Sequence, residues 1–253
     1  MLYDNPLSER AVVRPTFVQG VQALSFVTGC PIALVPNPRD MKDLLATINK
    51  VKPTFLTGVP TLWVAMMNHP DVQQGKVNIR SIKICVSGAA ALLAETKARF
   101  EQMTGGRIVE GYSLTEGMMA LCVNPVEGPN KLGSVGMPLP DVTVRIYDAD
   151  EGIREMATGE VGEICFSGLQ LMVGFWNRPE ETALVLRDHL DDDGTRRWLH
   201  TGDLGYLDED GYLFIVDRKK DLIKTSGYQV WPREVEEVLA THPAVLEVGV
   251  AAV

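Results

Sequence analysis

The sequence lacks the long apolar runs and the excess of basic residues that would indicate a membrane or a nucleic-acid partner. No stretch approaches the roughly 18 apolar residues of a spanning helix, and no leader-like pattern is seen near the N-terminus. The net charge is −9 at pH 7, with no basic stripe to offset it. This charge argues against nucleic acid but allows a nucleotide, because one or two local cations suffice to hold one. We expect a cytoplasmic protein.

Signatures of metal sites and triphosphate loops are also missing. The four cysteines lie in apolar runs, without a Cys-x-x-Cys pair or a histidine at metal-ligand spacing; they are Cys30, Cys85, Cys122 and Cys165. We expect them to be buried and reduced. There is no Gly-x-x-x-x-Gly-Lys-Ser/Thr loop, and no two glycines are separated by one residue. Neither a P-loop nor a Rossmann fingerprint is therefore present.

The apolar pattern predicts an α/β fold whose first part is a parallel-rich sheet with flanking helices. In residues 1–140, strands are expected at Pro31–Val35, Thr54–Leu56, Ile82–Val86 and Arg107–Glu110. Helices are expected between them, at Met41–Val51, Pro60–Asn68 and Leu93–Met103. This alternation is typical of one α/β subdomain.

The pattern changes after about residue 140. Residues 141–217 predict a small β-rich subdomain, with strands at Val142–Tyr147, Gly162–Ser167, Gly205–Leu207 and Tyr212–Val216 and one helix at Pro179–Arg187. Residues 218–253 predict the start of a small, incomplete α/β C-terminal domain, with a helix at Pro232–Ala240 and a strand at Val245–Val253. We expect the chain to stop inside that strand.

A loop suited to a nucleotide follows the expected strand Arg107–Glu110. It reads Gly-Tyr-Ser-Leu-Thr-Glu-Gly over residues 111–117, and ligands of open α/β sheets bind at the carboxyl ends of strands. Tyr112 offers a flat face for a base, Thr115 a hydroxyl for a phosphate and Glu116 an oxygen for Mg²⁺. The segment also fits a strand-to-helix turn with Thr115 as N-cap. It departs from the Gly-x-Ser-x-Gly elbow of hydrolases, because Thr115 replaces the second glycine.

Three other segments suit a nucleotide but have ordinary alternatives. Ser87–Ala90 follows a buried strand and has small side chains, which fit either an approaching ring or close helix packing. Asp203, expected at the end of a short strand, can accept from both ribose hydroxyls or simply close a turn. The run Asp217–Asp221 can be a functional basic cluster or a solvated charged turn.

Taken in order, these segments resemble the adenylate-forming enzymes: acyl-CoA synthetases, luciferases and peptide-synthetase adenylation domains. The matching motifs are SGAA (87–90), GYSLTEG (111–117), GSVGMP (133–138), GFWNRPEET (174–182), WLHTGD (198–203), DRKKDLIK (217–224) and SGYQV (226–230). With GVPTLW (58–63), the wording is most similar to bacterial long-chain fatty-acid CoA ligases.

The resemblance implies a nucleotide site. ATP or AMP would contact Ser87, Gly88, Ala89, Ala90, Gly111, Tyr112, Ser113, Thr115, Asp203, Arg218 and Gln229. Tyr112 would stack on adenine and Thr115 would touch the α-phosphate. Asp203, assisted by Arg218, would hold the ribose hydroxyls. Glu116 would bind Mg²⁺.

Other matching positions concern motion and the remaining substrates. Lys220 matches the hinge about which the small domain rotates between half-reactions, and Lys224 would contact the adenylate. The acyl pocket would be lined by Gly133, Ser134, Val135 and Gly136. Ser226 and Gly227 would approach the CoA arm.

The implied enzyme is an acid–thiol ligase of fatty-acid metabolism. A carboxylate would attack the α-phosphate of ATP to give acyl-AMP and pyrophosphate, and the CoA thiol would then displace AMP. The sequence departs from the family in having no Ser/Thr/Gly-rich phosphate loop and no Pro-Lys-x-x-x-Gly-Lys-like motif. We therefore expect a fragment, truncated at both ends and inactive alone. Adenylation for a carrier protein, or a non-catalytic nucleotide-binding fragment, are the alternatives.

Overall fold

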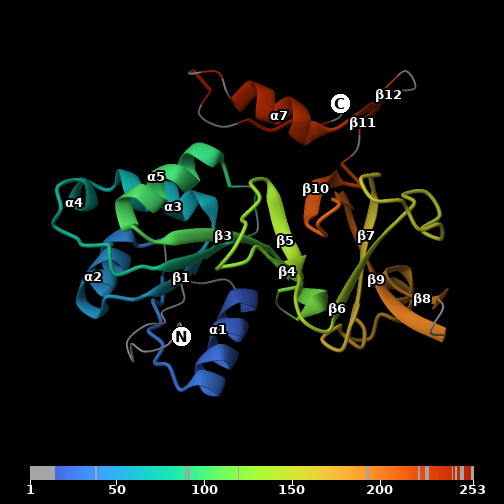
Figure 1. Ribbon diagram of the computed structural model, residues 1–253, viewed down its shortest axis with the longest axis horizontal. Helices are drawn as coiled ribbons and strands as arrows, with labels where there is room; N and C mark the ends of the chain where they lie inside the picture. Colours follow the sequence, from blue (N-terminus) through green and yellow to red (C-terminus); the bar gives the residue numbers. More distant parts are fainter. Residues whose placement is uncertain are drawn as a thin grey trace. The chain divides into compact units, whose positions relative to one another are not determined.

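The chain has a mixed α/β structure that divides into two compact units, Met1–Leu139 and Pro140–Val253 (Figure 1). The computed structural model describes residues 15–37, 39–88, 90, 92–118, 120–191, 194–221, 223–225, 228–240, 242, 244–245 and 248–251.

The first unit is built on a mixed sheet with the strand order β1-β2-β3-β4-β5. Three strands are parallel: β1 (Phe55–Gly58), β2 (Ile84–Ser87) and β3 (Arg107–Tyr112). Two antiparallel strands follow, β4 (Cys122–Val123) and β5 (Ser134–Pro138). The predicted parallel sheet is thus confirmed for β1 to β3 only. The predicted strand Pro31–Val35 is wrong, because only an isolated bridge at Ile32 forms there.

Helices connect the parallel strands. α3 (Pro60–Asn68) follows β1 and α5 (Ala94–Thr104) follows β2. Figure 1 shows both on the same side of the strands, which is what two right-handed crossovers produce. α2 (Met41–Val51) precedes β1 and begins where the Asp40 side chain accepts the N–H of Asp43 at 3.2 Å. The first unit also contains the helices α1 (Pro15–Thr28) and α4 (Pro70–Gln73).

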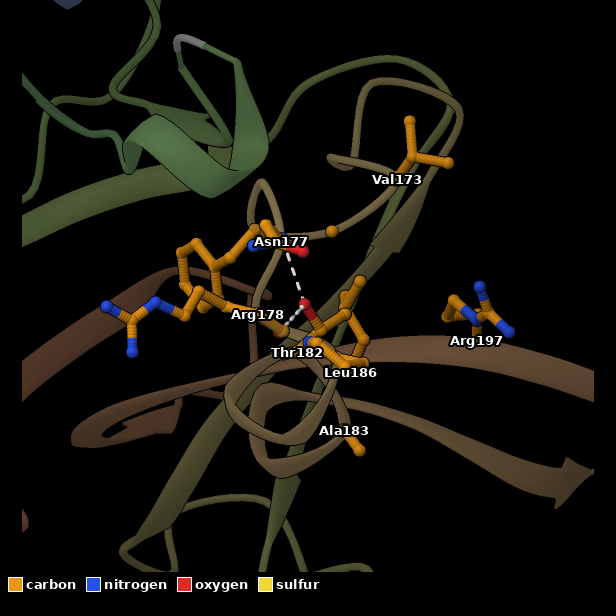
Figure 2. A pocket seen from close by; sticks show the side chains of 10 residues that line it. Val173, Asn177, Arg178, Thr182, Ala183, Leu186 and Arg197 are labelled. Atoms are coloured by element: carbon orange, nitrogen blue, oxygen red, sulfur yellow. Dashed lines mark hydrogen bonds between the residues drawn. The ribbon is translucent and has the colours of Figure 1, made fainter.

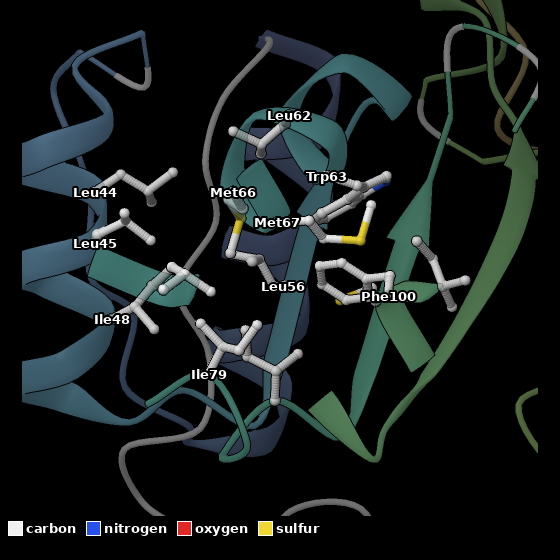
Figure 3. Close-up of a cluster of buried hydrophobic side chains, with 14 of the residues drawn as sticks. Leu44, Leu45, Ile48, Leu56, Leu62, Trp63, Met66, Met67, Ile79 and Phe100 are labelled. Atoms are coloured by element: carbon white, nitrogen blue, oxygen red, sulfur yellow. The ribbon is translucent and has the colours of Figure 1, made fainter. Parts of the chain in front are cut away.

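The core of the first unit lies between α2, α3, α5 and the parallel strands (Figure 3). The buried side chains of α2 are Leu44, Leu45, Ile48 and Val51, a spacing that keeps one helix face inward. On α3, Trp63 is fully buried, and its ring centroid lies 5.2 Å from that of Phe100 on α5. Burying each such large side chain contributes about 1.5–3 kcal/mol to folding.

The second unit contains an antiparallel sheet with the order β10-β9-β7-β6. Its strands are β6 (Val142–Tyr147), β7 (Gly162–Gly168), β9 (Gly194–Leu207) and β10 (Leu213–Arg218). The first part of β9 pairs with β8 (Leu186–Asp191), which follows α6 (Pro179–Val185). The predicted strand Gly205–Leu207 is only the end of β9, and β8 was not predicted.

A hairpin and a helix follow β10. β11 (Ile223–Thr225) pairs with β12 (Tyr228–Val230), and α7 (Pro232–Ala240) has the predicted bounds. The described residues of the predicted strand Val245–Val253, namely 245 and 248–251, belong to no strand. That prediction is therefore not supported over the part of the segment that the structure describes.

Candidate functional site

The carboxyl ends of β1, β2 and β3 lie side by side in the first unit. The parallel register places Gly58 opposite Ser87, and Ser87 opposite Glu110. The Gly88 N–H donates to the Gly58 carbonyl at 3.2 Å, which holds the chain after β2 against the end of β1. The segments predicted to flank a base, Ser87–Gly88 and Gly111–Tyr112, therefore come from neighbouring strands. Ala90 is exposed, and Ala89 lies outside the described residues.

The side chain of Ser87 is used by the core. Ser87 is fully buried, and its Oγ accepts a hydrogen bond from Nε1 of Trp63 at 3.0 Å. The Ser87 hydroxyl still has its own O–H and a second lone pair, but it is buried away from any ligand. Any contact of Ser87 with a nucleotide is thus left to its backbone.

The Gly-Tyr-Ser-Leu-Thr-Glu-Gly segment forms the end of β3 and a single 3₁₀ turn, η1 (Thr115–Gly117). Leu114 is the N-cap of that turn and makes no side-chain cap bond, so the reading of Thr115 as N-cap of an α-helix is wrong. Thr115 is exposed and Glu116 half-buried, whereas Ser113 is half-buried beside them. Tyr112 is only 8% exposed as a residue, so a base could reach only a small part of it.

The Gly-Ser-Val-Gly segment has a clear structural explanation. Gly136 in β5 has φ +90°, and a Cβ there would lie 1.9 Å from the Val123 carbonyl carbon in β4. Only glycine fits this approach. The Oγ of buried Ser134 accepts the Gly136 N–H at 2.9 Å, and Asn124 Nδ2 donates to the Ser134 carbonyl at 2.6 Å. A role of Gly133, Ser134, Val135 and Gly136 in an acyl pocket stays a prediction.

In the second unit, β9 and β10 bring Asp203 and Arg218 together. The two residues are opposite each other in the ladder, and Arg218 Nε lies 3.5 Å from Asp203 Oδ1. The Asp203 side chain is 13% exposed and that of Arg218 is 62% exposed. An ion pair with so exposed a partner adds about 0–1 kcal/mol to stability. The strand register, not the mutual attraction, therefore sets this carboxylate–guanidinium pair.

Asp203 lies inside β9 and not at the end of a short strand, which corrects the sequence prediction. The strand bends there: Gly202 has φ +73°, and the pairing with β7 shifts register between Glu163 and Cys165. Thr201 Oγ1 donates to the Ile164 carbonyl at 2.8 Å and accepts the Asp203 N–H at 3.0 Å. The bend turns the nearly buried carboxylate of Asp203 toward the end of β10.

Glu163, a buried carboxylate beside this bend, was not predicted from the sequence. Its Oε1 accepts the Gly202 N–H at 3.1 Å, and its Oε2 lies 3.3 Å from both Lys219 Nζ and His200 Nδ1. Burial opposes the charge on Glu163, but His200 and Lys219 outweigh it and lower the pKa of the carboxyl. An acidic residue in the otherwise apolar strand Gly-Glu-Ile-Cys-Phe was the available signal, because buried carboxylates are almost always paired.

The remaining predicted positions follow β10. Lys220 is exposed in a turn closed by the Asp221 N–H donating to the Arg218 carbonyl at 3.0 Å. The backbones of Lys224 and Gln229 are paired in the β11–β12 ladder. Ser226 and Gly227 lie outside the described residues. The hinge, adenylate and CoA roles of these positions stay predictions.

A separate pocket of about 510 Å³ lies along the Gly-Phe-Trp-Asn-Arg-Pro-Glu-Glu-Thr segment of the second unit (Figure 2). Thr182 shapes it: its Oγ1 donates to the Arg178 carbonyl at 2.7 Å and accepts the Phe175 N–H at 2.9 Å. Arg197 also lines the pocket. Neither Asp203 nor Arg218 is among the lining residues, so this hollow is distinct from the carboxylate–guanidinium pair.

Comparison with known proteins assigns the family. The model of the AMP-binding enzyme family, described as "AMP-binding enzyme", matches residues 16–176. The chain belongs to the AMP-binding enzyme family. It is 45% identical over 233 residues to a long-chain-fatty-acid–CoA ligase of Bacillus subtilis, an alignment that spans 92% of this chain and 40% of the ligase.

Solved structures agree with this AMP-binding assignment. ATP-bound MatB from Rhodopseudomonas palustris superposes with a TM-score of 0.80 at 31% identity, over 98% of this chain and 48% of MatB. O-succinylbenzoate coenzyme A synthetase (MenE) from Bacillus subtilis, in complex with ATP and magnesium ion, gives 0.79 at 29% identity, over 98% and 50%. The chain thus spans about 40% of the length of its curated relative and half or less of these structures.

Two observations bear on the metal and membrane expectations for this AMP-binding protein. Within the described ranges, no group of three or more His, Cys, Asp or Glu side chains is arranged to hold a metal ion. Glu116 alone beside the Thr115 hydroxyl fits Mg²⁺ that arrives with a nucleotide, since such ions use one or two protein carboxylates and keep phosphate and water ligands. No helix in the part of the chain that the structure covers is long and apolar enough to cross a membrane.

All four cysteines are buried and none forms a disulfide, as expected. Burial raises the pKa of the Cys85 thiol, with Glu101 adding to the effect, and burial likewise raises the pKa of the Cys122 thiol. Thiols held protonated in this way are poor nucleophiles. Cys85 and Cys122 are therefore packing residues of the first unit.

Proposed function

We propose that this chain is the nucleoside-binding part of an ATP-dependent fatty acyl-CoA ligase. The observation that carries the proposal is the Asp203–Arg218 pair, a nearly buried carboxylate and an exposed guanidinium fixed on adjacent strands. A carboxylate so placed can accept from both hydroxyls of a ribose. The identity to a long-chain-fatty-acid–CoA ligase supports a fatty acid as the carboxylate substrate.

The proposed reaction has two steps. A fatty-acid carboxylate attacks the α-phosphate of ATP and releases pyrophosphate, and the thiol of CoA then attacks the acyl carbon of the acyl-AMP and releases AMP. The part of this chain is to hold the nucleoside so that the α-phosphate lies in line with the carboxylate. Tyr112 and the backbone of Ser87–Gly88 would take the base, and Thr115 would meet the α-phosphate.

Glu116 is the proposed protein ligand of Mg²⁺. The ion supplies positive charge that offsets the charge developing on the phosphate oxygens. The half-buried carboxylate of Glu116, one residue from an exposed hydroxyl, provides a single anionic anchor for an ion carried by ATP.

Calorimetric titration of the purified chain with AMP and with an acyl-AMP analogue tests the nucleoside site. Asp203→Asn is expected to weaken AMP binding by about 10–100-fold, because hydrogen bonds to a charged group are worth about 1.5–3 kcal/mol. Asp188→Asn is the matched control, since Asp188 lies on β8 and its ion pair among the described residues is with exposed Arg197 at 3.1 Å. Equal AMP affinity of Asp203→Asn and the unaltered chain would contradict the ribose contact.

A thioester assay tests the catalytic part. We expect the 253-residue chain to form no detectable acyl-CoA from ATP, CoA and a palmitate-like acid, because its sequence has neither the Ser/Thr/Gly-rich phosphate loop nor the Pro-Lys-x-x-x-Gly-Lys-like motif. Product formation would overturn the expectation of inactivity. A folded chain that binds neither AMP nor the acyl-AMP analogue would overturn the nucleoside-binding proposal and favour a fragment with no function of its own.

A further inference from the structure

Glu163 connects the two segments that carry the Asp203–Arg218 pair. On one side, its Oε1 accepts the backbone N–H of Gly202, the residue before Asp203. On the other side, its Oε2 accepts from Lys219 Nζ, the residue after Arg218. The two segments also meet directly, because the Lys219 N–H donates to the Gly202 carbonyl at 2.8 Å. One carboxylate from β7 thus fixes both sides of the pair.

Stability alone does not require a buried ion pair at the position of Glu163, because an apolar side chain could fill the same space. The side chain is only 5% exposed, and replacing a buried ion pair by apolar residues of similar size is often neutral or stabilising. A backbone hydrogen bond and an ion pair to a specific lysine fix directions in a way that an apolar contact does not. Gly202 in particular has a positive φ and no side chain to hold it, so this acceptor limits its rotation.

Two histidines and a cysteine lie on the other side of the Glu163 carboxylate. His200 Nδ1 lies 3.3 Å from Glu163 Oε2 and 3.3 Å from Cys165 Sγ, and the Nε2 atoms of His200 and His189 are 3.0 Å apart. This histidine–cysteine side is closed, since the His200 side chain is 2% exposed. The side facing Gly202 and Lys219 is the one that leads to the surface, where Arg218 and Lys220 are exposed.

We propose that Glu163 is a positioning residue for the nucleoside site, one that orients the Asp203 carboxylate through the Gly202 peptide and ties Lys219 to the sheet. This inference rests on the proposed function of Asp203 as the ribose ligand. Glu163 itself does not touch the nucleotide in this scheme.

The test measures discrimination between AMP and 2′,3′-dideoxy-AMP by calorimetry, because this ratio reports the ribose hydroxyls alone. Glu163→Gln and Lys219→Met are expected to lower the preference for AMP about tenfold, the effect of misplacing one good hydrogen bond, and to leave dideoxy-AMP affinity unchanged. Glu160→Gln is the matched control, because Glu160 is exposed just before β7 and its carboxylate accepts the Ala157 N–H at 3.0 Å, without a contact to Gly202 or Lys219 among the described residues. It should keep the full preference.

A merely structural role of Glu163 would weaken both nucleotides equally, or only lower the melting temperature, and either result overturns the inference. Lys219→Met keeps the test usable if Glu163→Gln does not fold, since Lys219 lies at the surface end of the pair. Amide hydrogen exchange of Gly202 and Lys219 separates the two proposals. If the unaltered chain binds no AMP, the proposed nucleoside site is wrong. The positioning role is then judged from Glu163→Ala: faster exchange at the Gly202 and Lys219 amides supports it, and unchanged exchange at both overturns it.

Discussion

Replacing Ser87 by alanine should destabilise the first unit without weakening nucleotide binding per folded molecule. Ser87 belongs to a segment predicted to flank the base, but its Oγ accepts the Trp63 indole N–H at 3.0 Å, and both side chains are fully buried. Ser87→Ala removes the acceptor and leaves the indole donor in an apolar surrounding. The backbone of Ser87, which is the part left for a nucleotide, is unchanged.

The expected loss of unfolding free energy comes from the Trp63 indole N–H, which Ser87→Ala leaves without its acceptor. Leaving one buried polar group without a partner costs about 1–3 kcal/mol, more than the net value of an ordinary hydrogen bond of about 0.5–1.5 kcal/mol. The hydroxyl is small, so the cavity it leaves adds little. Urea unfolding followed by circular dichroism should show the lower free energy, and amide exchange in β2 should place it in the first unit, since two units do not have to unfold together.

Ser81→Ala is the matched control. Its Oγ is also buried but has no hydrogen-bond partner among the described residues, so removing it should be neutral or stabilising. The reasoning is refuted if Ser87→Ala is as stable as the unaltered chain, or if Ser81→Ala costs as much. A tenfold loss of AMP affinity in folded Ser87→Ala would instead show that the hydroxyl, and not only the backbone, contacts the nucleotide.

Two further predictions concern stability. Gly136→Ala should lower the unfolding free energy by more than about 3 kcal/mol, because the added Cβ would collide with the Val123 carbonyl carbon at a φ of +90°; an unchanged melting temperature would contradict this. Acid should also destabilise the chain: the pKa of His189 is lowered, first by burial and then by His200, and that of Glu163 is lowered by His200 and Lys219 in spite of burial. As the pH falls, these two groups therefore take up protons in the unfolded chain before they do so in the folded chain. Their contribution to the free energy of unfolding is fully present above about pH 6.5. It declines as the pH falls from there through the His189 pKa, and declines again below about pH 4.5 as Glu163 is protonated. Equal urea midpoints at about pH 8, 6 and 4 would contradict this sign.

The fold was predictable wherever the local pattern and the packing agree. α2 and α3 have the predicted bounds because their apolar spacing, the Asp40 cap and the proline at the start of α3 all favour the same helix. The prediction failed at β8 and β9, where polar residues such as Arg187, Asp188 and Arg197 sit in a ladder exposed on one edge. Strand pairing of that kind depends on partners distant in sequence, and no local propensity reports it.

The candidate site also combines residues that a local motif indicates with residues that only long-range strand pairing brings together. Asp203 and Arg218 could be proposed from motif order, yet their contact depends on a β9–β10 register that is shifted by an irregularity between Ile215 and Asp217. Glu163 lies 40 positions before Asp203, and only the β7–β9 pairing brings it to the Gly202 amide. A buried acid in an apolar strand signals that a partner exists, but not which one. The sequence therefore indicates the groups that meet a ligand, whereas the groups that orient them become visible only once the long-range pairing is known.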